Sequence, residues 1–223
     1  MRDRSRQLPR LNAILDEDVA RAARWTVPDL ARACLAGGAR FLQVRAKQAS
    51  SREYLALCSE VIALASDHDA IVIVNDRADI ARLCGASGVH VGQEDLPPIA
   101  VRVVIGDTLL VGLSTHTAEQ VRHALSQPID YFAVGPVFGT SSKATGHSAV
   151  GLEFVQQASA AAKAAAPNTA GSPLPVIAIG GITLDRAREV VDAGAAAVAV
   201  ISDLLTTGDP ESRVRSYLDA LEA

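Results

Sequence analysis

The stretch IVIVNDRADIARLCGASGVHVGQEDL, residues 71–96, contains two short apolar runs that each end in polar and acidic residues. Asn75 and Asp76 follow the first run, and a cluster that includes Asp95 follows the second. Helical spacing between them predicts a βαβ unit. Ligands bind at the carboxyl ends of parallel strands, so we expect both aspartates at one edge. Hard carboxylate oxygens suit Mg²⁺ there.

The same alternation continues along the chain. Eight apolar runs are expected as strands: residues 11–15, 39–44, 71–74, 88–91, 109–113, 130–134, 176–179 and 196–201. They are nearly continuous, as in strands buried on both faces, and helical patterns separate them. For 223 residues this predicts an α/β protein with a single (β/α)8 TIM barrel. An open doubly wound sheet is the alternative.

The barrel domain is expected over residues 11–223, after a disordered basic tail at residues 1–10. No apolar segment follows this tail, so it is not a secretory signal. The most apolar run, residues 193–201, is too short to span a bilayer, and we expect no membrane association.

Composition narrows the function further. The net charge of −4 gives no bulk attraction for nucleic acid. Cys34, Cys58 and Cys84 lack the spacing of a zinc site or a disulfide framework and fit a reducing cytoplasm.

Basic side chains follow the second strand. Gln43, Arg45 and Lys47 alternate along an extended segment, so they share one face. A guanidinium and an ammonium on one face suit a diphosphate, especially beside Asp76 and Asp95. The alternative is a solvated strand end.

Several residues of this rim have competing interpretations. Asp76 and Asp95 could each cap the helix that follows it. His90 lies inside a strand and is interpreted as structural, whereas Glu94 is expected to face solvent. His116 is left open between orientation and catalysis.

The later strand ends suggest a second anion site. Gly180 and Gly181 after the seventh strand, and Ser202 after the eighth, occupy the usual phosphate-binding position of barrels. The long loop at residues 135–150 contains TSSK, a run of donors that favours an anion. A diphosphate, a divalent cation and a second phosphorylated ligand together indicate alkyl transfer with diphosphate leaving.

At this point six segments resemble one family. They are QVRAK (43–47), VNDRADIA (74–81), GVHVGQEDLP (88–97), GLSTHT (112–117), DYFAVGPVFGTSSK (130–143) and AIGGI (178–182). Together and in this order they resemble thiamine-phosphate synthases. The resemblance implies that the thiazole nitrogen of 4-methyl-5-(2-phosphoethyl)thiazole, or of its carboxylated form, displaces the diphosphate of 4-amino-5-hydroxymethyl-2-methylpyrimidine. The resemblance also implies a dissociative route whose products are thiamine phosphate and diphosphate, with carbon dioxide as a third product when the carboxylated thiazole is used.

The resemblance also implies residue roles. The Mg²⁺ ligands would be Asp76 and Asp95. The pyrimidine diphosphate would contact Gln43, Val44, Arg45, Ala46, Lys47, Asn75, Ser114 and Lys143, with catalysis on Arg45, Lys47, Ser114 and Lys143. The thiazole phosphate would contact Thr140, Ser142, Gly181, Ile201 and Ser202, and Ser141 is also expected to bind substrate.

Two positions depart from the family pattern. Ala46 stands where the family usually has Glu, and Ser142 where it has Thr; neither change removes a needed donor. A thiazole tautomerase paralogue and a non-catalytic phosphate-binding barrel are the competing functions. The rim carboxylates and the TSSK run argue against both, and a homo-oligomer stays open.

Overall fold

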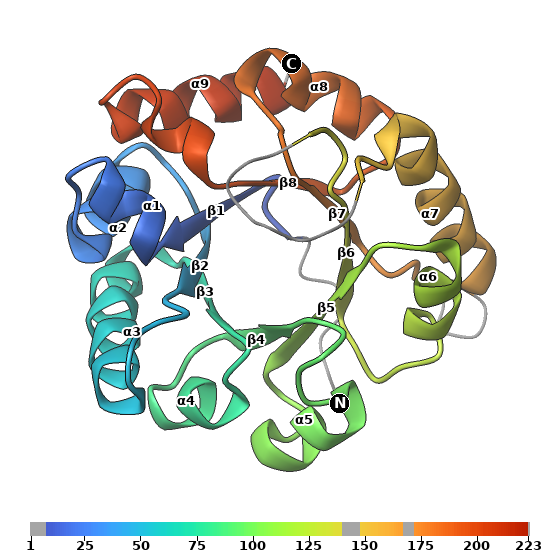
Figure 1. Cartoon of the computed structure of the whole chain (residues 1–223), viewed down its shortest axis with the longest axis horizontal. Coiled ribbons are helices and arrows are strands. Elements are labelled where there is room, and N and C mark those ends of the chain that lie inside the picture. The colour runs from blue at the N-terminus through green and yellow to red at the C-terminus, as the bar shows by residue number, and fades with distance from the viewer. Residues whose placement is uncertain (1–7, 140–147, 167–171, 223) are drawn as a thin grey trace.

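Eight parallel strands close into a barrel in the computed structural model, which describes residues 8–139, 148–166 and 172–222. Each strand pairs with the next and β8 pairs with β1, with helices forming an outer ring (Figure 1). The predicted single barrel is confirmed, and the open sheet is wrong. The strands are β1 (Leu11–Asp16), β2 (Phe41–Arg45), β3 (Ile71–Asn75), β4 (Gly88–Val91), β5 (Leu110–Thr115), β6 (Tyr131–Val134), β7 (Val176–Ile179) and β8 (Ala197–Val200).

The helices follow the strands in turn. They are α1 (Glu17–Ala22), α2 (Val27–Ala36), α3 (Ser51–Ala65), α4 (Ala78–Leu83), α5 (Pro98–Ile105), α6 (Ala118–Ala124), α7 (Gly151–Ala165), α8 (Leu184–Asp192) and α9 (Pro210–Glu222), with 3₁₀ turns η1 (Ser66–His68) and η3 (Ser202–Leu205). The sequence pattern did not predict α1. Asp16 starts it, because its carboxylate accepts the Val19 amide hydrogen at 3.0 Å.

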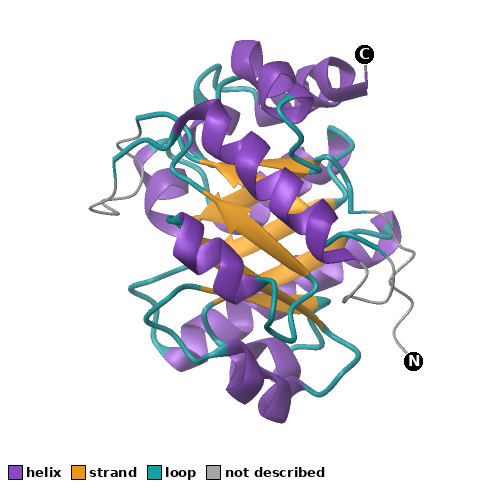
Figure 2. Cartoon of the chain, turned by 90° about the vertical axis from the view of Figure 1, so that its right-hand side faces the viewer, coloured by secondary structure: helices purple, strands orange, loops and turns teal. Residues whose placement is uncertain are grey.

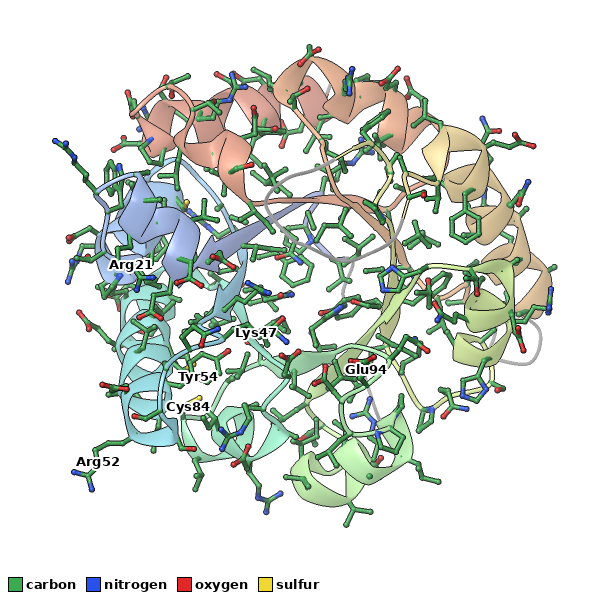
Figure 3. The ribbon with its side chains drawn as sticks, in the orientation of Figure 1. Arg21, Lys47, Arg52, Tyr54, Cys84 and Glu94 are labelled. Carbon is green, nitrogen blue, oxygen red and sulfur yellow. The ribbon has the colours of Figure 1, made fainter. Side chains whose placement is uncertain are left out.

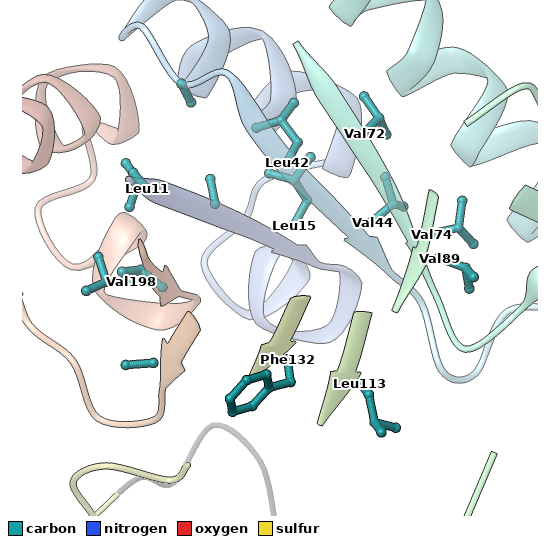
Figure 4. Packing of buried hydrophobic residues seen from close by; sticks show 14 of the residues in the cluster. Leu11, Leu15, Leu42, Val44, Val72, Val74, Val89, Leu113, Phe132 and Val198 are labelled. Carbon is teal, nitrogen blue, oxygen red and sulfur yellow. The ribbon is translucent and has the colours of Figure 1, made fainter. Parts of the chain in front are cut away.

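The core has two parts because strand side chains alternate between faces. One set points outward and packs under the helices; Leu15, Leu42 and Val74 belong to it (Figure 4). The other set fills the barrel and includes Ile14 and Phe41. Seen from the side, the strands cross the middle of the molecule between helices (Figure 2). The barrel is therefore packed on both sides of its wall.

Two residues of the predicted tail contact the barrel. Leu8 is buried in the interior cluster, and the Arg10 guanidinium donates to the Leu221 carbonyl at the end of the chain. Residues 1–7 lie outside the described part of the chain.

Within the described residues, every helix is too short or too polar to cross a bilayer.

Candidate active site

A cavity of about 340 Å³ opens at the carboxyl ends of the strands. It is lined by side chains from all eight strands or the turns that follow them. The predicted site residues that line it are Gln43, Arg45, Lys47, Asn75, Asp76, Asp95, Ser114, Gly181, Ile201 and Ser202. The structure thus brings together residues that are far apart in the sequence, as expected for strand ends of a barrel.

Arg45, at the end of β2, does not stand alone. Its guanidinium forms an ion pair with Asp16, whose side chain is only 3% exposed at the end of β1. The Asp16 carboxylate also caps α1, so both of its roles fix its position. Arg45 is therefore held at the cavity edge by a buried carboxylate that the sequence reasoning had not assigned to the site.

Lys47 and Asp76 form the second ion pair of the rim. Lys47 Nζ lies 2.6 Å from Asp76 Oδ2, and Figure 3 shows Lys47 directed towards the middle of the ring. Asp76 has a φ of +64°, and its backbone N–H donates to the His90 carbonyl at 2.7 Å. This left-handed conformation is strained for an aspartate and marks a constrained position.

Burial raises the pKa of Asp76, and the neighbouring carboxyl of Asp95 raises it further, while Lys47 opposes both effects. Asp95 Oδ2 in turn accepts the Gly92 amide hydrogen at 2.7 Å. The two carboxyls thus approach each other at the cavity from the turns that follow β3 and β4. A cation between them would remove the repulsion that burial intensifies.

The capping alternatives for these aspartates are wrong. The N-cap residues of α4 and α5 are Arg77 and Pro97, and neither helix has a side-chain cap bond. Glu94 is exposed, as expected.

Asp76 and Asp95 alone could supply only some of the oxygen ligands that a magnesium ion needs. In the described ranges, no group of three or more His, Cys, Asp or Glu side chains gathers as a metal cluster. Mg²⁺ is usually held by one or two carboxylates, with waters and substrate phosphates completing its octahedron. Asp76 and Asp95 match that arrangement, because an incoming diphosphate would supply the missing oxygens.

Val44 on β2, and Ala46 directly after it, differ from the neighbouring residues that line the cavity. Their side chains are buried in the outer core, away from the cavity. The Val44 carbonyl accepts from the Tyr54 hydroxyl at 2.7 Å, and that hydroxyl accepts the Asn75 amide hydrogen at 3.0 Å. Any contact of Val44 or Ala46 with a substrate would have to come from the backbone.

Ser114, on β5, lies beside His90 inside the cavity. Its Oγ is 2.8 Å from His90 Nε2, and His90 Nδ1 is 3.2 Å from the hydroxyl of Tyr131. The exposed Gln93 amide donates to the Ser114 carbonyl. His90 is buried and hydrogen-bonded, which agrees with a structural histidine, but it also contacts a predicted substrate-binding residue.

His116 is oriented by the backbone. Its Nδ1 lies 2.7 Å from the Gly135 carbonyl, so this nitrogen carries the proton and donates. This contact supports the orienting interpretation, although the ring also lines the cavity.

The turns after β7 and β8 present backbone instead of charge. Gly180 and Gly181 have φ values of +102° and +63°. A Cβ at Gly181 would lie 2.5 Å from the Gly139 carbonyl oxygen, so the two turns approach too closely for a side chain. Amides at such a turn can point at an anion.

Four predicted site residues, Thr140, Ser141, Ser142 and Lys143, lie outside the described residues. The ends of the loop are described. The Val137 and Phe138 amides donate to the carbonyls of Ile179 and Gly180 at 2.9 Å each. The chain therefore enters this loop directly beside the glycine turn.

Asn12 is a lining residue that the sequence reasoning missed. It is 2% exposed on β1, and its Oδ1 has no hydrogen-bond partner within the described chain. A buried polar atom without a partner is costly in a folded protein. Its position inside an expected strand was the only available signal.

These features define a class. The barrel gathers two carboxylates, two cations and a glycine turn around one cavity, which is typical of barrel enzymes that act on phosphorylated small molecules. The chain belongs to the thiamine monophosphate synthase family, because the model of that family matches residues 11–204.

Individual proteins agree with this assignment. A thiamine-phosphate synthase of Koribacter versatilis is 41% identical over 219 residues, covering 97% of this chain and 98% of that protein. One of Anaeromyxobacter dehalogenans is 42% identical over 193 residues, covering 86% and 82%. The structure of a thiamine phosphate pyrophosphorylase from Pyrococcus furiosus superposes with a TM-score of 0.81 at 30% identity, covering 96% and 95%.

Proposed function

We propose that this chain is a Mg²⁺-dependent thiamine-phosphate synthase. It would transfer the 4-amino-2-methylpyrimidin-5-ylmethyl group from its diphosphate to the nitrogen of 4-methyl-5-(2-phosphoethyl)thiazole or its carboxylated form. One observation carries the proposal most directly. The Lys47–Asp76 ion pair stands beside Asp95 and Arg45 at the mouth of the cavity, so cations for a diphosphate adjoin carboxylates for its metal.

The two ion pairs of the rim explain how a charged substrate is accepted. Without substrate, Arg45 is neutralised by Asp16 and Lys47 by Asp76. When the diphosphate binds, Lys47 would turn from Asp76 to a phosphate oxygen, which would leave Asp76 able to hold the metal together with Asp95. Arg45 keeps Asp16 and offers its remaining N–H groups to the diphosphate. No charged group is left buried without a partner.

The bond changes need no general base. The bond between the pyrimidine methylene carbon and the diphosphate oxygen breaks, and diphosphate leaves with the electron pair. The thiazole nitrogen then donates its lone pair to the methylene cation, and the carboxylated form also loses its carboxyl group as carbon dioxide. Arg45 and Lys47 stabilise the charge that develops on the leaving group, and Ser114 adds a hydrogen bond. Bound at Asp76 and Asp95, Mg²⁺ would supply further neutralisation of that charge.

The thiazole phosphate is assigned to the opposite side of the cavity. Gly181, Ile201 and Ser202 line it there. The entry of the 140–147 loop beside Gly180 supports a contribution from Thr140, Ser141 and Ser142 to the same phosphate, and from Lys143 to the diphosphate. This separation keeps the two anions apart while the rings meet between them.

The proposal is tested by a reconstituted reaction. Purified protein, MgCl₂ and both substrates should yield thiamine phosphate and diphosphate in equal amounts, measured by chromatography with mass detection. Omitting Mg²⁺ or adding excess EDTA should abolish the product. Formation of no thiamine phosphate in the complete reaction with MgCl₂ would overturn the proposal.

The partners expected for this activity are the two small-molecule substrates. Free thiols at Cys34, Cys58 and Cys84 support the proposed cytoplasmic location. Homo-oligomerisation stays a prediction, to be measured by light scattering.

A further inference from the structure

Three side chains from neighbouring strands form a hydrogen-bonded chain inside the barrel. The hydroxyl of Tyr131, on β6, lies 3.2 Å from Nδ1 of His90, on β4. Nε2 of His90 lies 2.8 Å from Oγ of Ser114, on β5. The His90 and Tyr131 rings are stacked, with centroids 5.5 Å apart and planes at 27°. All three residues line the cavity, so the chain leads from the barrel interior to the place where substrate is expected.

Tyr131 determines which groups donate and which accept in this series of hydrogen bonds. Its side chain is fully buried, and burial raises the pKa of the hydroxyl, which keeps its proton. Among the described residues, its hydrogen bond is to His90 Nδ1. Because a buried hydroxyl proton needs an acceptor, Tyr131 donates and Nδ1 accepts. A neutral imidazole with a bare Nδ1 carries its proton on Nε2.

The consequence appears at Ser114. Its Oγ accepts the hydrogen bond from His90 Nε2, so the hydroxyl proton is directed to another acceptor. We infer that Tyr131 and His90 are positioning residues that fix Ser114 as a hydrogen-bond donor to the substrate in the cavity. The acceptor would be a diphosphate oxygen or a ring nitrogen of the pyrimidine substrate, and this part rests on the proposed function. The inference about the tautomer of His90 does not rest on the proposed function.

The surrounding packing is built for this arrangement. A Cβ at Gly112 would lie 2.4 Å from His90 Nδ1 and 2.2 Å from Tyr131 Cζ. Glycine at this position therefore leaves the room in which the two side chains meet. Phe41 contacts the Tyr131 ring edge-on, with centroids 6.0 Å apart and planes at 89°, which limits rotation of the phenol.

The first test reads the tautomer directly, without any activity. ¹⁵N chemical shifts of His90 in the ligand-free protein should show a protonated Nε2 and a bare Nδ1. In Tyr131→Phe the ring keeps its packing but loses the donor, so a mixture of tautomers is expected. An Nδ1-protonated His90 in the wild-type protein would overturn the inference.

The second test separates positioning from stability. Tyr131→Phe should raise KM for the pyrimidine diphosphate by roughly 2- to 10-fold, the effect of one neutral hydrogen bond, and leave KM for the thiazole phosphate unchanged. His90→Gln, whose amide can still donate to Ser114, should retain more activity than His90→Ala. The exposed His123→Ala on α6 is the matched control and should change neither constant. Equal rises in both constants for Tyr131→Phe, or no rise in either, would contradict the inference.

A third variant covers the case in which Tyr131→Phe does not fold. Ser114→Ala should keep the Nε2-protonated tautomer, because Tyr131 sets it, while KM for the pyrimidine diphosphate rises. Loss of that tautomer in Ser114→Ala would show that Ser114 sets it instead. If the wild-type protein makes no thiamine phosphate, the proposed function fails. The ¹⁵N spectrum still decides which groups donate and which accept in the hydrogen bonds from Tyr131 through His90 to Ser114.

Discussion

The two sides of the cavity, each proposed to bind one anion, differ in the groups that they offer. The side formed by β2, β3 and β4 uses charged side chains that neutralise one another in ion pairs, namely Arg45 with Asp16 and Lys47 with Asp76. The side formed by β7 and β8 offers Gly180 and Gly181 in left-handed backbone conformations. Movable charges suit a leaving group whose charge grows during the reaction, whereas fixed amides suit a phosphate that only anchors.

The largest effect is expected from the carboxylates of the charged side. Asp76→Asn and Asp95→Asn should each lower kcat/KM by roughly 10²–10³-fold, as for loss of a group that stabilises developing charge. Steady-state rates over a range of MgCl₂ concentrations would measure this. The exposed Glu94→Gln is the control and should behave as wild type. Normal turnover of both aspartate variants would refute the metal assignment even if the activity were correct.

A substitution in the glycine turn after β7 should change a different kinetic constant, the KM for the thiazole phosphate. In Gly181→Ala the new Cβ would meet the Gly139 carbonyl at 2.5 Å, and alanine would be strained at a φ of +63°. We expect KM for the thiazole phosphate to rise by about 10-fold, with about 1–3 kcal/mol lost from the free energy of unfolding. Gly208→Ala, with a φ of +76° and open space around it, keeps the conformational strain without the clash. If both variants raise KM equally, the close approach of the turns is not what matters.

A smaller effect is expected behind the charged side. Tyr54→Phe removes the hydroxyl that joins the backbone of Val44 to that of Asn75. Because these buried groups lose a partner, about 1–3 kcal/mol of unfolding free energy should be lost, measured by urea denaturation. Ser59→Ala, on the exposed face of the same helix, should cost far less. A similar loss in both variants would mean that the helix, and not the link between strands, was weakened.

The smallest effect should come from the rim ion pair itself. A double-mutant cycle of Lys47→Met and Asp76→Asn should give a coupling of at most about 1 kcal/mol in unfolding free energy, since the Lys47 side chain is 45% exposed. The same pair should matter far more for KM of the pyrimidine diphosphate. A large coupling in stability would assign these charges to the fold instead of the substrate.

The fold was predictable because its signal is local and repeated. Each buried strand reads as a short apolar run, and eight such runs in alternation with helices leave few arrangements. The short helix α1 was missed, since its start depends on Asp16, which sequence reasoning treated only as the end of a strand. The same residue was missed in the site, although it follows an apolar run just as Asp76 does.

The site was predictable only at positions where strand ends converge by construction. Arg45, Asp76 and Gly181 were expected at the rim for this reason, and all three line the cavity. The partners were not predictable. Tyr131 meets His90 across 41 residues of chain, and the orientation of both depends on the strand register around the barrel. Such contacts have no local signature in a single sequence.

The absent side chain at position 112 has a consequence for how this protein can change over generations. Gly112, His90 and Tyr131 occupy one shared space, since any Cβ at 112 would overlap both rings. A larger residue at position 112 is therefore harmful unless smaller side chains already replace both His90 and Tyr131. Replacing those two residues first would leave a cavity in the barrel interior. Relatives should accordingly keep all three residues or replace all three, with few intermediates between.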